Sequence, residues 1–418
     1  MQKKLSNYKV FKYCRLCDSN NLNLIYNFKP MPIGNDLRKS INLSIKSKRY
    51  PLKLMNCKDC NHFQLSVAVN PKILFSKNYS YLTGITNTFK NHFDIYAQWI
   101  IKKCNLKPSS LVIDIGSNDG TCLSYFKKNK MDVLGVDPAK EASKIANKNK
   151  IKTINSFFNT RTANFIFKKY GEVDFITSHN VLAHTENIKE IFESIFKILK
   201  VNGYFCFEIG YFKEVINKNL FDTIYHEHLD YHHANPLIRF LEKIGFSIVN
   251  LSTNNIQGGT LRILLQKKKK LSKQSIKTKN FLKNEKKYFK ISKINNKFKK
   301  FNISMNKLNK IIKGINLLEK SVFAYGSPTK ASLLLISSKL NNNLIKNTFE
   351  DNILKCNKYI PGTDIKIISS MNIKKINPKN IIILAWNFTD EIKQKLINLK
   401  LKNINLIIPL PKPKVFKL

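Results

Sequence analysis

The chain has 418 residues, which is long for one domain and predicts two or three hydrophobic cores. Its formal net charge of +46 suggests a nucleic-acid partner, but only six of its 73 basic residues are Arg. Phosphate contacts tend to enrich Arg, so this Lys excess indicates a codon bias and argues against nucleic-acid binding. No apolar run reaches the roughly 18 residues of a membrane span, and "MQKKLSNYKV" lacks a hydrophobic signal core, which predicts a cytoplasmic protein.

Residues 1–72 contain two Cys-x-x-Cys pairs and are predicted to form a small metal-binding module. Each pair fits a tight turn whose two thiolates chelate one ion, and two turns supply the four sulfur ligands that zinc prefers. All four ligands would be protein atoms, so the expected zinc is structural; the alternative is four unrelated buried thiols. The 39 residues between the pairs exceed the roughly 15–20 of a zinc ribbon and should carry structure of their own. The predicted ligands are Cys14, Cys17, Cys57 and Cys60.

Residues 73–267 are predicted to form a parallel α/β domain. Four apolar segments, "LVIDIG", "DVLGVD", "VDFITS" and "GYFCFEIG", alternate there with helical stretches. Residues 268–310 are rich in Lys and lack Pro and Gly, which favours a basic helical connector over a solvated spacer. Residues 311–418 show a second, shorter α/β alternation. The predicted fold class is therefore α/β, in three units joined by the connector.

A glycine-rich loop, "DIGSNDG" at 114–120, follows the first of these strands. Glycines let the backbone approach a ligand closely, and the helix behind the loop presents free N–H groups. The loop is neither the Rossmann nor the P-loop motif. Asp137 ends the next strand, where a carboxylate can accept hydrogen bonds from both ribose hydroxyls of an adenosine. An acidic loop favours a cofactor with a positive centre and no phosphate, such as S-adenosylmethionine, over a nicotinamide cofactor or an inert turn.

The segment "SHNVLAH" at 178–184 follows the fourth strand, whose end faces the transferred methyl group in this class of fold. It lacks the Asn/Asp-Pro-Pro-aromatic motif of many amino-group methylases, and no Pro-Cys nucleophile for pyrimidine C5 methylation is evident. The chain therefore lacks the motifs that distinguish methyltransferases acting on nucleic-acid bases. His184 is a candidate catalytic or substrate-holding residue; the alternative is a histidine at a helix start that bonds only backbone.

The segment "FDTIYHEHLDYHH" at 221–233 holds four of the chain's eight histidines and follows the fifth strand. Methylation of carbon requires a base that removes a proton next to a carbonyl and groups that hold the resulting enolate. A neutral His228 is a competent base, Glu227 can orient it and stabilise its charged form, and Tyr225 can donate to the oxyanion. The alternatives are a metal site and a structural cluster. The other three histidines are expected to be bystanders.

These motifs together resemble the S-adenosylmethionine-dependent C-methyltransferases that act on nucleotide-linked keto-deoxysugars. The resemblance covers nearly the whole chain and rests on "CRLC", "CKDC", "YSYLTG", "DIGSNDGTCL", "GVDPA", "HNVLAH", "YHEHLDYH", "GGTLR", "AYGSPTKASLLL", "YIPGTDI" and "ILAWNFTDEI". It implies a zinc-binding N-terminal module, a central class I methyltransferase domain of Rossmann-like fold, and a C-terminal Rossmann-like domain that helps to hold the sugar nucleotide.

The resemblance also implies roles for individual residues. His228 would be the base that abstracts a ring proton of an NDP-sugar, S-adenosylmethionine would donate the methyl group, and the zinc would be structural. The cofactor site would be lined by Gly116, Asn118, Asp119, Asp137 and Asn180. The active-site positions would be Tyr79, His184, Tyr225, Glu227 and His228, with Tyr81 as the alternative to Tyr79.

In the C-terminal unit, "AYGSPTKASLLL" is predicted to form a strand, a turn and a helix with a cation, a combination able to hold a diphosphate. The candidate substrate-binding residues are Tyr325, Gly326, Ser327 and Lys330. The alternative is a tight turn with a surface Lys. Two other functions stay open: a basic zinc-containing RNA-binding protein or RNA methyltransferase, and a non-catalytic assembly protein. The sequence predicts no oligomeric state.

Overall fold

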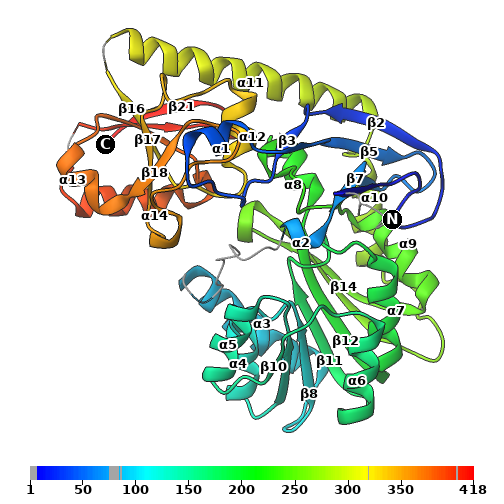
Figure 1. The fold of residues 1–418 in the computed structure, drawn as a ribbon. Helices are drawn as coiled ribbons and strands as arrows, with labels where there is room; N and C mark the ends of the chain where they lie inside the picture. Colours follow the sequence, from blue (N-terminus) through cyan, green and yellow to red (C-terminus); the bar gives the residue numbers. More distant parts are fainter. Residues whose placement is uncertain (1–6, 75–83, 85–86, 319, 402) are drawn as a thin grey trace, which may run out of the picture.

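The computed structural model describes residues 7–74, 84, 87–318, 320–401 and 403–418. Figure 1 shows two α/β domains, with the long helix α11 (Ile291–Leu317) lying along the C-terminal one. The N-terminal strand β2 (Leu22–Asn27) packs against this helix, where the Tyr26 and Phe298 rings stack with centroids 4.4 Å apart. Within the described residues, no helix is both long and apolar enough to cross a membrane.

The middle of the chain forms a seven-stranded sheet with the order β10-β9-β8-β11-β12-β15-β14. Neighbouring strands from β10 to β12 are parallel, whereas β15 runs antiparallel to both β12 and β14. The strands are β8 (Leu111–Ile115), β9 (Asp132–Val136), β10 (Thr153–Ile154), β11 (Val173–His179), β12 (Leu199–Gly210), β14 (Phe246–Asn254) and β15 (Thr260–Lys267). The four strands predicted from apolar segments are β8, β9, β11 and β12, so these predictions are confirmed.

Helices cover both faces of this sheet (Figure 1). On one face lie α3 (Asn87–Cys104), α4 (Thr121–Lys128) and α5 (Lys140–Lys148); on the other lie α6 (Thr160–Tyr170), α7 (Ile188–Ile198) and α9 (Ala234–Ile244). Successive residues of a strand face opposite sides, so Val112 packs in the core with α3 and α4, and Ile113 in the core with α6 and α7. Both side chains are fully buried, as expected for a parallel sheet covered on both faces.

The carboxyl ends of the parallel strands carry the predicted site loops. β8 lies between β9 and β11, so the chain leaves β8 toward one side and later returns on the other. In open α/β sheets ligands bind at this switch point. Loop 116–120 follows β8, Asp137 follows β9, and residues 180–184 follow β11. The short helices α8 (Phe212–Asn217), η2 (Phe221–Thr223) and η3 (Ile256–Gly258) complete this domain.

The N-terminal residues form small antiparallel sheets, one of which includes a strand of the central domain. Strand β13 (Asp230–Tyr231) extends the sheet of β2, β5 (Lys53–Cys57) and β6 (Phe63–Leu65) in the order β13-β6-β5-β2. The other elements are β1 (Tyr8–Val10), β3 (Met31–Pro32), β4 (Arg49–Tyr50), β7 (Val67–Val69), α1 (Ile41–Ile45) and α2 (Pro71–Leu74). The loop between the cysteine pairs thus has the structure of its own that was predicted. Because β13 belongs to segment 221–233, the N-terminal module is joined directly to the candidate site.

The C-terminal residues form a six-stranded sheet with the order β18-β17-β16-β19-β20-β21, parallel except for the β20–β21 pair. Its strands are β16 (Val322–Tyr325), β17 (Asn347–Glu350), β18 (Lys366–Ser369), β19 (Asn380–Ile383), β20 (Asn405–Ile408) and β21 (Lys414–Lys417). Its helices are α12 (Ala331–Ser337), α13 (Ile373–Ile376), α14 (Thr389–Asn398), η4 (Ile353–Lys355), η5 (Ser370–Asn372) and η6 (Trp386–Phe388). The second α/β alternation predicted from the sequence is therefore confirmed.

The Lys-rich connector is helical, as predicted, and consists of α10 (Ile276–Lys286) and α11. Helix α11 continues to Leu317, beyond the predicted connector end at residue 310. Apolar residues at helical spacing bury one side of α11 in the core of the C-terminal sheet; they are Ile294, Phe298, Phe301, Met305, Leu308 and Ile312. The connector is therefore solvated on one side and packed into the C-terminal domain on the other.

Candidate active site and metal centre

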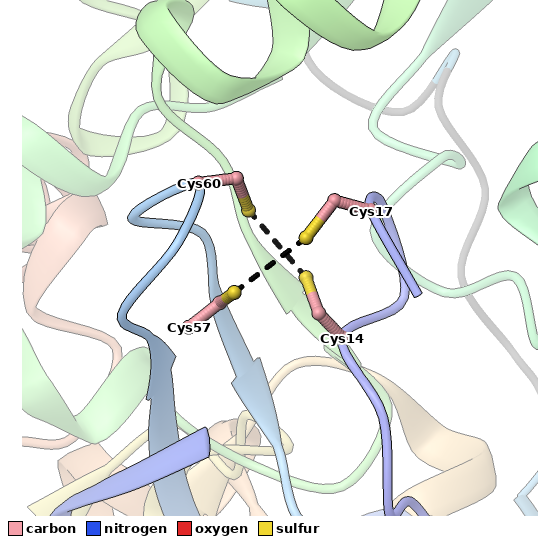
Figure 2. Close-up of side chains that lie close together, drawn as sticks. All are labelled: Cys14, Cys17, Cys57 and Cys60. Atoms are coloured by element: carbon pink, nitrogen blue, oxygen red, sulfur yellow. Dashed lines mark hydrogen bonds between the residues drawn. The ribbon is translucent and has the colours of Figure 1, made fainter. Parts of the chain in front are cut away.

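The four cysteines of the two pairs converge at one end of the N-terminal sheet. Figure 2 shows their sulfur atoms pointing toward a common centre, with Cys14 Sγ 3.5 Å from Cys60 Sγ and Cys17 Sγ 3.6 Å from Cys57 Sγ. All four sulfurs lie within 4.8 Å of one another. A tetrahedral zinc ion with Zn–S bonds of about 2.3 Å needs sulfur separations of about 3.8 Å, so the cluster fits zinc. With four protein ligands the ion has no open position, as expected for a structural site.

The glycine-rich loop turns sharply at the end of β8. Gly116 and Gly120 have φ angles of 75° and 80°, in the left-handed region that favours glycine. A Cβ atom on Gly116 would lie 2.2 Å from Cγ2 of Val181, so this position tolerates no side chain. Asp119 is buried, and its Oδ2 accepts a hydrogen bond of 2.7 Å from the Gly84 N–H. The loop thus combines close backbone approach with a carboxylate.

Asp137 lies beside this loop at the end of β9. Its Oδ2 accepts a hydrogen bond of 2.8 Å from the Asn118 N–H, and its Oδ1 accepts one of 2.7 Å from the Ala139 N–H. Burial raises the pKa of Asp137, whereas these two N–H groups lower it. Each carboxylate oxygen has a second acceptor position, so ribose hydroxyls can still bind. Two carboxylates at the loop fit a cofactor with a positive centre such as S-adenosylmethionine, and Asn180 follows β11 at the same sheet edge.

His228 and His184 come together beyond the end of β11. Their ring centroids are 4.8 Å apart, and the Leu229 N–H donates to the Ala183 carbonyl at 2.7 Å. Nδ1 of His228 lies 3.0 Å from the Thr223 carbonyl oxygen, which can only accept, so Nδ1 carries the proton. The free electron pair of His228 therefore sits on Nε2, which lies 3.1 Å from the Tyr225 hydroxyl oxygen.

The same reasoning applies to His184, whose Nδ1 donates to the Glu227 carbonyl at 2.7 Å. Burial, followed by the neighbouring His184 ring, lowers the pKa of His228 to about 3. Burial also lowers the pKa of His184. Both rings are therefore neutral near pH 7, and the His228 ring presents an acceptor nitrogen rather than a cation.

The Glu227 side chain is buried, bonds the N-terminal domain through Asn35, and is linked to the C-terminal domain only through that residue. Its Oε1 accepts a hydrogen bond of 2.8 Å from Asn35 Nδ2, and Asn35 Oδ1 accepts one of 2.7 Å from the Thr329 hydroxyl. Burial raises the pKa of Glu227 to about 7, although the bond from Asn35 lowers it. The contact that orients the His228 ring comes from Thr223, whereas the sequence suggested Glu227 for that role.

The other three histidines of the segment are buried. His226 Nε2 lies 3.3 Å from the Tyr50 carbonyl oxygen, His233 Nδ1 lies 3.2 Å from a carboxylate oxygen of Glu285, and His232 is buried. In the part of the chain that the structure describes, the histidines of this segment do not converge on a possible metal site. The metal alternative for segment 221–233 therefore has no support.

A further cluster brings His92, His179 and Glu208 together, with one possible ligand atom from each within 4.8 Å of the others. His92 Nε2 and His179 Nδ1 lie 2.7 and 3.1 Å from Oε2 of Glu208, at the end of β12. The other oxygen of Glu208 accepts from Arg262 at 2.6 Å and from Asn254 at 2.9 Å. An arginine at this distance pairs with the carboxylate, and the group is a polar network that joins α3, β11, β12, β14 and β15.

In the C-terminal unit, the predicted strand, turn and helix are β16, residues 326–330 and α12. The candidate donors make internal contacts: the Ser327 N–H donates to Glu350 Oε2 at 2.8 Å, and the Tyr325 hydroxyl donates to Asp351 Oδ1 at 3.0 Å. The Gly326 N–H donates to the Phe349 carbonyl at 2.7 Å. Only 12% of the Lys330 side chain is exposed, and its Nζ lies 3.6 Å from Asp222 Oδ2, so it is not the surface lysine of the alternative.

Two residues that the sequence did not single out, Asn35 and Thr223, contact the candidate site directly. Asn35 is revealed only by a contact across 192 positions. Thr223 lies within segment 221–233, but it acts through its backbone carbonyl, which its residue type does not signal. Tyr79 and its alternative Tyr81 lie outside the described residues. The rings of His184, Tyr225 and His228 lie close together, whereas the Glu227 carboxylate is bonded by Asn35.

Three family models match consecutive parts of the chain. Residues 14–75 match the "Putative zinc binding domain", residues 93–251 match the "Methyltransferase domain", and residues 255–411 match the "C-methyltransferase C-terminal domain". The chain is also 26% identical over 404 residues, or 96% of each sequence, to the C-methyltransferase NovU of Streptomyces niveus.

Solved structures also show similarity. They include magnesium protoporphyrin IX methyltransferase from Synechocystis PCC 6803 (14% identity, 43% of this chain and 82% of that one, TM-score 0.35). Another is a SAM-dependent methyltransferase from Archaeoglobus fulgidus (16% identity, 42% and 94%, TM-score 0.34). The matched models, the strand order and the sulfur cluster agree with the class I methyltransferase fold and zinc module expected from the sequence. The chain is therefore an S-adenosylmethionine-dependent C-methyltransferase whose N-terminal domain binds zinc through four cysteines.

Proposed function

We propose that this C-methyltransferase methylates a ring carbon of a nucleotide-linked keto-deoxysugar, with His228 as the base. The observation that carries the proposal is the tautomer of His228. The Thr223 carbonyl holds the proton on Nδ1, so Nε2 offers its electron pair beside the Tyr225 hydroxyl. The choice of substrate rests on the family resemblance along the chain and on the presence of a C-methyltransferase C-terminal domain.

A carbon next to a ketone is acidic because its electron pair can delocalise onto the carbonyl oxygen. His228 Nε2 takes the proton from that carbon, and the Tyr225 hydroxyl turns from Nε2 to donate to the developing oxyanion. When bound, S-adenosylmethionine supplies an electrophilic methyl carbon. The C–H bond is thus replaced by a C–C bond, and the imidazolium of His228 later releases its proton to water.

The environment of His228 couples its protonation to enolate formation. A pKa of about 3 in the substrate-free site means that the ring does not take up a proton from water near pH 7. A negative charge forming beside the ring offsets the cost of burying the imidazolium. The site is therefore suited to transfer a proton from a bound carbon acid.

The test is to incubate the protein with S-adenosylmethionine and a panel of NDP-4-keto-6-deoxysugars, followed by mass spectrometry. We expect one acceptor to gain a single methyl group. In deuterated buffer without cofactor, the same sugar should exchange one ring hydrogen. His228→Asn should abolish both reactions while S-adenosylmethionine still binds. His226→Asn, the same change two residues away, is the matched control and should retain them.

Two outcomes contradict the proposal. Turnover of His228→Asn at the rate of the unaltered protein would reject His228 as the base. Failure of every keto-sugar, together with methylation of a different acceptor class such as RNA, would reject the sugar substrate.

A further inference from the structure

Arg15 lies inside the first zinc knuckle, between Cys14 and Cys17, and its side chain points to the catalytic loops. Its Nε donates to Asp230 Oδ1 at 2.9 Å, and its Nη2 donates to Asp230 Oδ2 at 3.0 Å. This bidentate pair is almost fully buried, with side-chain exposures of 4% for Arg15 and 0% for Asp230. Asp230 lies two residues after His228, the proposed base.

The same guanidinium also holds the loop that carries His184. Nη1 of Arg15 donates to the Glu186 carbonyl at 2.9 Å, and Nη2 donates to the Thr185 carbonyl. Thr185 is the residue after His184. One side chain from the zinc knuckle therefore bonds both segments whose histidine rings meet at the proposed site. A planar guanidinium with several fixed donors suits this bridging role better than a lysine.

The second knuckle reaches the same carboxylate. His62 lies two residues after Cys60, and its Nε2 is 2.9 Å from Asp230 Oδ1. Pairing of β13 with β6 adds a backbone connection, in which Asp230 lies opposite Gln64. Gln64 Oε1 in turn accepts a hydrogen bond of 2.8 Å from the Arg15 N–H. Both knuckles thus converge on Asp230.

We infer that Arg15 is a positioning residue for methyl transfer, which links the folded zinc knuckle to the relative placement of His184 and His228. The inference rests on the proposed function, because it assigns meaning to that placement. The zinc module would then contribute to catalysis indirectly. The ion stabilises the knuckle that contains Arg15, and Arg15 bonds the loops that carry His184 and His228. The zinc itself takes no part in the chemistry.

The test separates a positioning role from a purely structural one. Arg15→Leu leaves the buried Asp230 without its guanidinium partner and with only His62, and should lower both stability and turnover. The double variant Arg15→Leu/Asp230→Leu removes this carboxylate and should recover the unfolding temperature. If Arg15 positions the site, turnover of this stable double variant stays about 100-fold low, since small displacements of catalytic groups have effects of that size. Arg15→Lys keeps the positive charge but cannot bond Asp230 through two nitrogens, so its turnover should lie between that of Arg15→Leu and that of the unaltered protein.

Two further readouts accompany turnover. Backbone hydrogen exchange should increase in residues 183–186 and 225–231 of the double variant, while zinc content and the dissociation constant for S-adenosylmethionine stay unchanged. Lys58→Leu is the matched control, because exposed Lys58 occupies the equivalent position of the second knuckle.

Full turnover in the stable double variant, or unchanged exchange in both loops, would overturn the inference. Failure of the proposed function has a different signature. In that case the unaltered protein would methylate no keto-sugar, but the double variant would still show increased hydrogen exchange in residues 183–186 and 225–231.

Discussion

Lys330 Nζ lies 3.6 Å from Asp222 Oδ2 in the buried contact between the C-terminal domain and the catalytic segment. The ammonium also lies over the Trp386 ring, 3.4 Å from its centroid, and the Trp386 indole N–H donates to the same Asp222 oxygen at 2.5 Å. Asp222 directly precedes Thr223, whose carbonyl holds the His228 ring. Lys330, which the sequence suggested as a diphosphate ligand, thus pairs with the residue next to Thr223, whose carbonyl orients the proposed base His228.

Lys330→Met should destabilise the protein by about 3 kcal/mol, because it leaves the fully buried Asp222 without its cation. Urea unfolding at pH 7 measures this difference. The double variant Lys330→Met/Asp222→Asn should recover most of the loss. An unchanged unfolding midpoint in the single variant would show that the pair contributes no stability.

Glu227 should make stability depend on pH. Burial raises its pKa in the folded protein to about 7 from 4.5, so the folded state holds this proton more tightly than the unfolded state. The resulting stabilisation is complete below about pH 4.5 and is lost as the pH rises through about 7, and it amounts to about 3 kcal/mol. Glu227→Gln should remove this dependence, measured as the free energy of unfolding between pH 5 and 8 relative to the unaltered protein. The exposed Glu141→Gln is the control; equal pH curves for both variants would contradict the assignment.

Asn35 should tune the activity profile through Glu227. Its amide donates to the Glu227 carboxylate and lowers its pKa, so Asn35→Leu should raise that pKa further. If the carboxylate is the active form, the rise of kcat/KM with pH should move to higher pH in this variant. Thr329→Val, which keeps the Asn35 amide, should shift the profile less. A variant profile that coincides with that of the unaltered protein would show that Glu227 does not control the rate.

The sulfur cluster should bind about one zinc ion per chain, measurable by elemental analysis. Cys60→Ser should lower both the zinc content and the unfolding temperature, because a structural zinc site contributes folding free energy. Cys104→Ser, a buried thiol outside the cluster, is the control and should retain the metal. Full zinc occupancy in Cys60→Ser would contradict the assigned ligand set.

Asp137 should govern cofactor affinity. Asp137→Ala removes the carboxylate proposed to accept the ribose hydroxyls, and should weaken S-adenosylmethionine binding on the order of 100-fold, or about 3 kcal/mol. Titration calorimetry measures the dissociation constant. Asp132→Ala, at the opposite end of the same strand, should bind the cofactor normally. Equal affinity in both variants would remove Asp137 from the cofactor site.

Much of the fold and part of the site could be predicted from the sequence. Features that depend on neighbouring residues were accessible: the two cysteine pairs, the apolar strands, the glycine-rich loop and the helical connector. Such patterns report local geometry, because a knuckle, a strand or a tight turn needs particular residues at short spacing. The family resemblance added the roles of His228 and its neighbours, which no periodicity reveals.

Contacts between distant residues were decided by the tertiary structure alone. Arg15 and Asp230 are separated by 215 positions, and Asn35 and Glu227 by 192, so no local pattern could pair them. The partner of Lys330 could not be predicted either, because the sequence does not distinguish a lysine that pairs with a carboxylate inside the protein from one exposed to solvent. The chain itself specifies which chemical groups are present. Packing the three domains together decides which groups become neighbours and which charges lose water, and with them the pKa values and the orientation of the His228 ring.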